Sequence, residues 1–156
     1  MDGYGFEALV SAMERKRGHK TILTPTAGDE GVDVLALQQQ VLWLFQCKHN
    51  ASGSPVDREA LDELRRGFEG WSARRLSAAR GLTIRLCLVT SGPVTGRLRR
   101  EAQADGIDVR DGRVVRSLLE QLGVTEADCQ EAGAGRAPTM RNVQDELASL
   151  LRRAEA

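Results

Sequence analysis

The chain has 156 residues, 41% of them hydrophobic, and its 22 basic and 22 acidic side chains cancel at neutral pH. A chain of this length can bury one core of ordinary domain size. No apolar run is long enough to span a membrane and no basic-then-apolar leader opens the sequence, so we expect a cytoplasmic protein. The three cysteines, Cys47, Cys87 and Cys129, are too few and too scattered for a disulfide framework, and no C-x-x-C pair indicates zinc.

The first predicted element is a helix over residues 4–17. Apolar residues recur there at helical spacing from Phe6 to Met13, and Gly18 follows as a stop signal. An acidic residue, Glu7, lies beside this apolar stripe. We therefore expect an amphipathic helix with a carboxylate next to its buried face.

Strands and helices then follow in a recognisable order. Strands are predicted over residues 20–25, 32–37, 41–49, 82–91 and 106–112. Further helices are predicted after Asp57 and over residues 94–104, 114–123 and 139–153. A hairpin followed by a βαβ-like half indicates an α/β fold with a mixed central sheet flanked by helices. The expected organisation is a domain over residues 1–124, a small-residue linker over 125–138 and a C-terminal amphipathic helix over 139–156.

The predicted hairpin carries polar residues at the ends of its strands. Strand alternation places Gln46 and Lys48 on the same face. Asp33 lies opposite Gln46 if the loop holds two residues, Gln39 and Gln40, or four. A three-residue loop instead pairs Asp33 with the neighbour of Gln46, because a slip of one residue moves every side chain to the other face.

Burying a charged side chain is costly unless it is paired or binds a metal. A carboxylate, an amide oxygen and a backbone carbonyl are hard oxygen ligands that suit Mg²⁺, and a nearby ammonium stabilises a developing anion or orients a water. Asp33, Gln46 and Lys48 on one face therefore predict metal-assisted hydrolysis of a phosphodiester. The alternative is a turn acid, a satisfied edge amide and a solvated lysine at a strand end.

Four segments have an order of elements that is also seen in a known family. They are "GFEALV", "TAGDEGVDVLAL", "LFQCKH" and "LCLVTSGPVTGRLRREAQADGIDVRDG". Helix, Asp-bearing turn, Q-x-K strand and a downstream strand, helix and strand resemble the Mrr-like catalytic domain of the PD-(D/E)xK nuclease superfamily, known from type IV restriction enzymes. The resemblance covers most of residues 4–123 and implies a restriction-endonuclease-like fold and a metal-dependent DNA endonuclease.

The resemblance implies a role for each matching residue. Asp33 corresponds to the metal-binding acid, and Lys48 to the motif lysine. Gln46 stands at the acidic position of the motif, in the form typical of the Mrr-like branch, and Glu7 corresponds to the first-helix acid that completes or orients the site. The implied cofactor is Mg²⁺, or Mn²⁺ in its place, with Asp33, Gln46, the backbone carbonyl of Cys47 and Glu7 as the expected ligands.

The middle of the chain is strongly basic. Residues 65–100 contain nine arginines and one acid, a local charge of +8. Such a block fits either a phosphate-facing patch or a solvated arginine-rich helix face. The expected nucleic-acid contacts are Arg74, Arg75 and Arg80, together with His49, which follows Lys48 and is expected to contact a phosphate.

These features leave several functions open. The first is an Mg²⁺-dependent endonuclease that acts as a cleavage module in defence against foreign DNA. The others are a non-catalytic nucleic-acid-binding or assembly module that keeps the nuclease fold, and an enzyme similar to Holliday junction resolvases. The expected partners are DNA and a second copy of the chain, or another protein that supplies DNA specificity or activation.

The C-terminal helix must bury its apolar side against something, because an isolated helix of this length is marginal in water. Its apolar residues are Met140, Val143, Leu147, Leu150 and Leu151. Its surface can pack on the parent domain, on a second copy of the chain or on another protein. Pairing with a second copy would bring two nuclease sites together.

Overall fold

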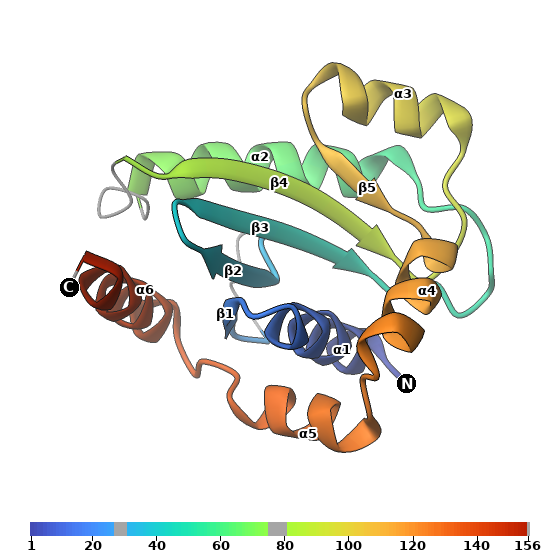
Figure 1. Cartoon of the computed structure of the whole chain (residues 1–156). Coiled ribbons are helices and arrows are strands. Elements are labelled where there is room, and N and C mark those ends of the chain that lie inside the picture. Colours follow the sequence, from blue (N-terminus) through green and yellow to red (C-terminus); the bar gives the residue numbers. More distant parts are fainter. Residues whose placement is uncertain (27–30, 75–80, 156) are drawn as a thin grey trace.

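The computed structural model describes residues 1–26, 31–74 and 81–155. Within these ranges five strands form one sheet in the order β1-β2-β3-β4-β5 (Figure 1). The strands are β1 (Lys20–Leu23), β2 (Val34–Gln38), β3 (Val41–Lys48), β4 (Thr83–Thr90) and β5 (Asp108–Arg110). The first three pair antiparallel and the last three parallel, so the predicted mixed sheet is confirmed.

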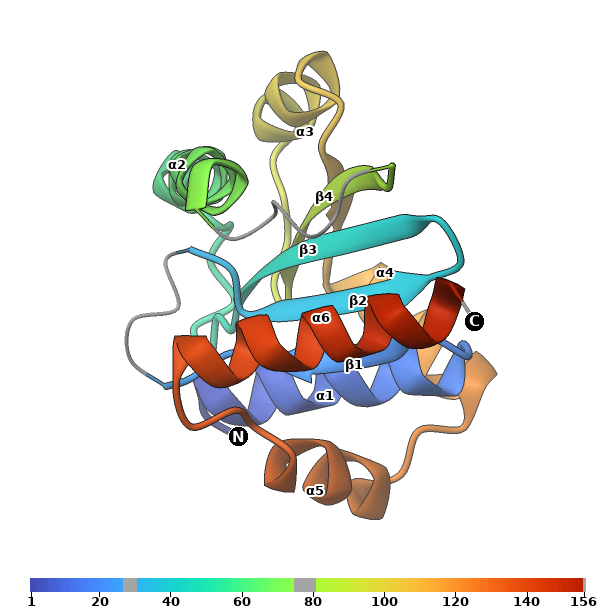
Figure 2. The same ribbon diagram turned by 90° about the vertical axis from the view of Figure 1, so that its left-hand side faces the viewer.

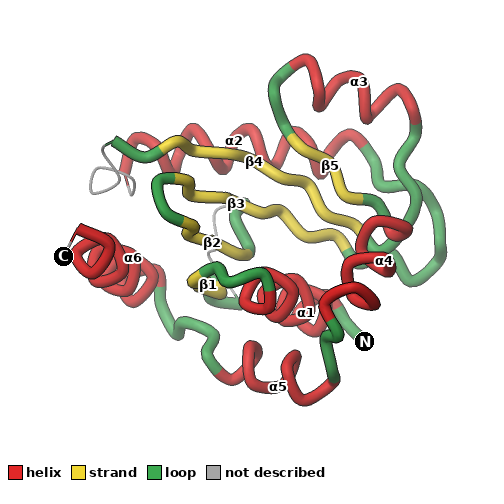
Figure 3. The backbone as a smooth tube through the Cα atoms, viewed as in Figure 1, coloured by secondary structure: helices red, strands yellow, loops and turns green. Residues whose placement is uncertain are grey.

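Helices cover both faces of this sheet (Figure 3). The described helices are α1 (Gly3–Lys16), α2 (Arg58–Arg74), α3 (Gly96–Ala104), α4 (Gly112–Leu122), α5 (Glu126–Ala134) and α6 (Met140–Glu155). Local signals fix several ends: Asp2 accepts a hydrogen bond from the Gly5 amide at 2.7 Å, and the left-handed Gly123 ends α4. None of these helices combines the length and the hydropathy that a membrane crossing needs.

The β2–β3 hairpin has the register that the sequence allowed with a two-residue turn. Gln38 pairs with Val41 across the turn residues Gln39 and Gln40, and Val34 pairs with Phe45. The paired register ends there, because the Asp33 amide donates at 2.8 Å to the carbonyl of Phe45, the same residue that pairs with Val34. The two-residue loop is therefore confirmed, and the Cys47 amide, which donates to Asp33 Oδ2 at 2.8 Å, holds this carboxylate beside the end of β3.

Each face of the sheet has its own core because side chains alternate along the strands. Phe45 and Cys47 point to the face covered by α1, where Phe6, Val10 and Met13 pack. The opposite face is covered by α2, α3 and α6. Gln46 and Lys48 lie two and four positions after Leu44, so their side chains point to the same face as Leu44, the one that α2 covers.

The C-terminal helix α6 docks on its own sheet. Figure 2 shows α6 lying along β1 and β2, and its apolar residues pack with Leu35, Leu37, Leu42 and Trp71. Val143 is fully buried and Leu147 is 2% exposed. Of the three occupants considered for this apolar surface, the structure selects the parent domain, so this surface is not available to a second copy.

The segment expected to be a linker contains a helix. Within residues 125–138, α5 packs along α1, and Ala132 is fully buried. Thr125 and Asp128 form a capping box at its start. The description of this segment as a plain linker was therefore wrong in its secondary structure. Small side chains are common in flexible linkers, but they also allow a helix such as α5 to pack closely on α1.

A buried ion cluster ties α1 to the far edge of the sheet. Glu14 on α1 is fully buried, and its Oε2 lies 3.3 Å from both Arg17 Nη1 and Arg110 Nη1. Its Oε1 lies 3.2 Å from His19 Nδ1. Because Arg110 comes from β5 and also lies over the Phe45 ring, the cluster links three parts of the core.

Candidate active site

The predicted site residues line one pocket of about 620 Å³. Its lining comes from the start of the chain, the β2–β3 hairpin and α2, and consists of Glu7, Gly31, Asp33, Gln46, Cys47, Lys48, Glu63, Arg66, Gly67 and Gly70. All five residues named for catalysis or metal binding are in this set. The structure thus brings them together, while their roles stay a prediction.

Asp33 is held at the head of the hairpin by backbone contacts. Its amide donates to the Phe45 carbonyl at 2.8 Å, and its carboxylate Oδ2 accepts from the Cys47 amide at 2.8 Å. Asp33 is only 3% exposed. Burial raises the pKa of the Cys47 thiol well above its ordinary value, with smaller contributions from the charges of Asp33 and Glu7, so the sulfur is neutral.

Gln46 has one satisfied and one unsatisfied amide atom. Its Nε2 donates to Glu63 Oε2 at 3.2 Å, whereas its buried Oε1 has no hydrogen-bond partner among the described residues. Turning the amide over would set Oε1 against a carboxylate oxygen, which is also an acceptor. A buried carbonyl oxygen without a partner costs about 1–3 kcal/mol, which a ligand that accepts its lone pair would offset.

Lys48 lies two residues further along β3 and shares the same acid. Its Nζ donates to Glu63 Oε2 at 2.7 Å, and both side chains are about one-third exposed, at 35% and 33%. Glu63 was not identified from the sequence. Its position one residue before Leu64, on the face of α2 that also presents Gly67 and Gly70 to the pocket, was the available signal.

Glu7 is paired with an arginine from the C-terminal part of the chain. Arg136 Nη1 lies 2.8 Å from Glu7 Oε1 and donates to the Thr24 carbonyl at 2.7 Å. The guanidinium also lies over the Tyr4 ring. Arg136 was missed as well, because nothing local in its small-residue surroundings indicates a contact 129 positions away.

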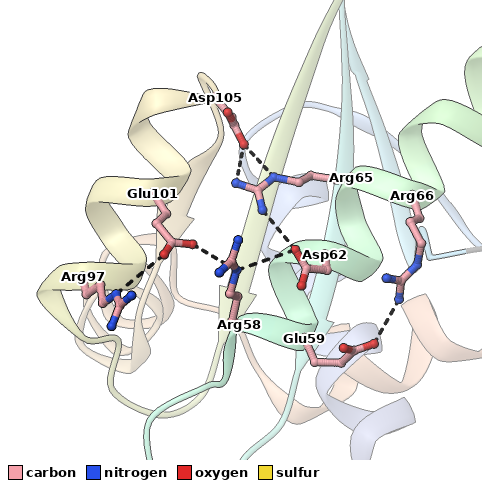
Figure 4. A network of polar contacts seen from close by, with 8 residues as sticks. All are labelled: Arg58, Glu59, Asp62, Arg65, Arg66, Arg97, Glu101 and Asp105. Atoms are coloured by element: carbon pink, nitrogen blue, oxygen red, sulfur yellow. Dashed lines mark hydrogen bonds and ion pairs between the residues drawn. The ribbon is translucent and has the colours of Figure 1, made fainter.

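The arginine-rich block does not form a free basic face where the structure describes it. Figure 4 shows Arg65 between Asp62 and Asp105, and Arg66 bound to Glu59. Further described members of the block in ion pairs are Arg85, Arg97 and Arg99. These contacts favour the alternative of a solvated, ion-paired surface for this part of the block.

Most of the predicted nucleic-acid contacts fall outside the described part of the chain. Arg75 and Arg80 lie outside the described residues, as does the side chain of Arg74. His49 is described: its Nδ1 lies 2.9 Å from Ser91 Oγ, and its ring is 5.8 Å from that of Phe6. It therefore helps to anchor the end of β3.

The donor set of the pocket suits a hard divalent cation. No three His, Cys, Asp or Glu side chains in the described ranges gather closely enough to hold a metal by themselves. The Asp33 carboxylate, the unpartnered Gln46 Oε1 and a backbone carbonyl are nonetheless oxygen donors of the kind that Mg²⁺ prefers. On this observation the residues fit the implied metal.

A mixed sheet between helices, with a Q-x-K strand beside a buried aspartate, defines a restriction-endonuclease-like protein. A family model described as a restriction endonuclease, the Mrr catalytic domain, matches residues 1–119. The chain therefore belongs to the Mrr catalytic family of restriction endonucleases, as the sequence resemblance predicted. A comparison with curated proteins gives no significant match.

Solved structures share the fold at low identity. The MspJI restriction endonuclease in complex with a 27-mer oligonucleotide has a TM-score of 0.53 at 20% identity over 84% of this chain. The DNA modification-dependent restriction endonuclease AspBHI has a TM-score of 0.52 at 22% identity, also over 84%. The chain spans only 31% and 34% of these two proteins. A protein of unknown function, AF1548, has a TM-score of 0.58 at 12% identity, with 97% of each chain covered.

Proposed function

We propose that the chain is a metal-dependent DNA endonuclease that hydrolyses phosphodiester bonds as a cleavage module in defence against foreign DNA. The observation that carries the proposal is the convergence of Asp33, Gln46 and Lys48 in one pocket, with the Gln46 Oε1 buried and unpartnered among the described residues. Membership of a restriction endonuclease family supports nuclease chemistry. The oligonucleotide in the MspJI complex supports DNA as the substrate.

Asp33, the Gln46 Oε1 and the Cys47 carbonyl would hold the metal. When bound, Mg²⁺ supplies charge stabilisation to the phosphate oxygens and lowers the pKa of a coordinated water. Glu7 already binds Arg136 at 2.8 Å, so we assign it the smaller role of orienting the site. The Asp33 carboxylate is fixed by the Cys47 amide and needs little reorganisation to act as a ligand.

Lys48 is the cation that we assign to the scissile phosphate. Its ammonium lines the pocket and is one-third exposed, so a phosphate oxygen can approach it. In hydrolysis a water oxygen attacks phosphorus, the bond to the leaving oxygen breaks, and one product keeps the phosphate while the other gains a hydroxyl. Lys48 would stabilise the negative charge that develops on the phosphate oxygens.

The choice of DNA target belongs to other parts of the system in this proposal. Residues 1–124 act as the nuclease domain, and the segment from 125 onwards packs on it. Cutting both strands of a duplex needs two sites or two visits, so we propose a homodimer or a partner protein that supplies specificity or activation. Since the apolar side of α6 is used internally, a dimer would form through another surface.

The test is cleavage of plasmid, linear, single-stranded and branched DNA, with and without modified bases, in Mg²⁺ and in EDTA. Asp33→Asn and Lys48→Met should each lower the Mg²⁺-dependent rate at least about 100-fold while circular dichroism and DNA binding persist. Asp62→Asn, outside the pocket, is the matched control. Full-rate cleavage by Asp33→Asn contradicts the assignment, DNA binding without cleavage by the parent chain indicates the non-catalytic module, and a strong preference for branched DNA indicates the resolvase-like enzyme.

A further inference from the structure

We propose that Glu63 on α2 is a positioning residue that supplies the negative charge missing at Gln46 and fixes the orientation of that amide towards a metal. The inference rests on the function proposed above and extends it to a residue outside the Q-x-K strand. Glu63 acts through Gln46 and Lys48.

A single oxygen of Glu63 joins both polar residues at the end of β3. Its Oε2 accepts from Gln46 Nε2 at 3.2 Å and from Lys48 Nζ at 2.7 Å. The two donors lie two positions apart and so point to the same face of the strand. One carboxylate therefore sets the direction of the amide and of the ammonium together.

The orientation of the amide follows from this contact. Glu63 accepts only from the NH₂ end of Gln46, so the other end, Oε1, must point away from α2. That oxygen is buried without a partner among the described residues. The contact with Glu63 therefore leaves the Gln46 Oε1 as an acceptor at the position where an acidic residue of the motif would present a carboxylate oxygen.

The charge of Glu63 also lies where a charge is absent at residue 46. A glutamine ligand contributes no charge to a divalent cation, and Glu7 is already paired with Arg136. Gly31 lets α2 lie close to the Asp33 loop, because an added Cβ at Gly31 would lie only 2.7 Å from the Glu63 carbonyl oxygen. Gln46 on β3 thus supplies the neutral amide, and Glu63 on α2 supplies the negative charge.

The test measures Mn²⁺ binding without DNA, by electron paramagnetic resonance of free Mn²⁺, together with thermal unfolding. Glu63→Gln should weaken Mn²⁺ binding at least about tenfold, because a nearby charge is removed from a partly buried site. Asp62→Asn removes the same charge from the adjacent residue, which pairs with Arg58 and Arg65, and should change the affinity less than about threefold. Asp33→Asn is the reference for a lost metal ligand.

An exchange of the two groups provides the sharper result. Gln46→Glu alone sets two carboxylates against each other, so the metal-free protein should melt at a lower temperature and Mn²⁺ should restore it. The double variant Gln46→Glu with Glu63→Gln should recover both the metal-free stability and an affinity within about threefold of the parent.

The outcomes separate this inference from the proposed function. If Asp33→Asn loses Mn²⁺ binding but Glu63→Gln behaves like Asp62→Asn, the role of Glu63 is overturned and the metal site stands. The same holds if the second substitution does not rescue the melting temperature of Gln46→Glu. Unchanged Mn²⁺ affinity in Asp33→Asn overturns the proposed function and this inference with it.

Discussion

Replacing Gly31 by alanine should disrupt the close packing of α2 against the loop that contains Asp33. Gly31 has φ +81°, and an added Cβ would lie 2.7 Å from the Glu63 carbonyl oxygen and 3.1 Å from the Gly67 Cα. Both neighbours are backbone atoms, so relief requires the loop or α2 to move. A left-handed conformation costs alanine about 1 kcal/mol relative to glycine, and overpacking against backbone adds about 1–3 kcal/mol.

The matched control is Gly18→Ala. Gly18 has a similar φ of +90°, but no atom lies within 4 Å of its added Cβ, so it pays only the conformational cost. Urea unfolding should show a loss of about 1 kcal/mol for Gly18→Ala and of about 2–4 kcal/mol for Gly31→Ala. Weaker Mn²⁺ binding should accompany only Gly31→Ala. Equal losses in the two variants would refute the argument that close approach at Gly31 positions α2.

Two further predictions concern the core. Glu14→Gln leaves Arg110 without its buried carboxylate and should lower the free energy of unfolding in urea by about 3–5 kcal/mol. The control Glu59→Gln, in an exposed pair with Arg66, should change it by less than about 1 kcal/mol, and comparable losses in the two variants would contradict this account. Burial raises the pKa of the Cys87 thiol from 9.0 to about 12, so above about pH 9 the unfolded chain releases a proton that the folded chain keeps, and stability falls as pH rises. Cys87→Ala should make that fall shallower between pH 9 and 11 in pH-dependent unfolding, and an unchanged slope would show that other groups cause it.

The hairpin was predictable because its information is local. Apolar alternation and a two-residue turn at Gln39 and Gln40 determine which residues of β2 and β3 face each other, and the hairpin brings Asp33 to the end of β3, where the Cys47 amide donates to its carboxylate. Apolar side chains at helical spacing likewise predicted α1 and α6 within one or two residues of their observed bounds. The sequence pattern could not choose the surface on which α6 packs, since the same apolar stripe suits any apolar partner.

The residues that the sequence did not reveal act over long distances. Glu63 reaches Lys48 across 15 positions and Arg136 reaches Glu7 across 129, and no periodicity encodes such pairs. The helix α5 escaped for a different reason: among its residues only Ala132 is buried, so it lacks an apolar stripe, although the capping box at Thr125 was legible.

The contact between Glu7 and Arg136 gives the pocket an order of assembly during synthesis. Glu7 is synthesised before its partner, which follows 129 positions later. A nascent chain that has not yet reached residue 136 lacks the guanidinium that neutralises this carboxylate and ties it to the Thr24 carbonyl. Glu7 therefore attains its described pairing in the pocket only after residue 136 has been synthesised.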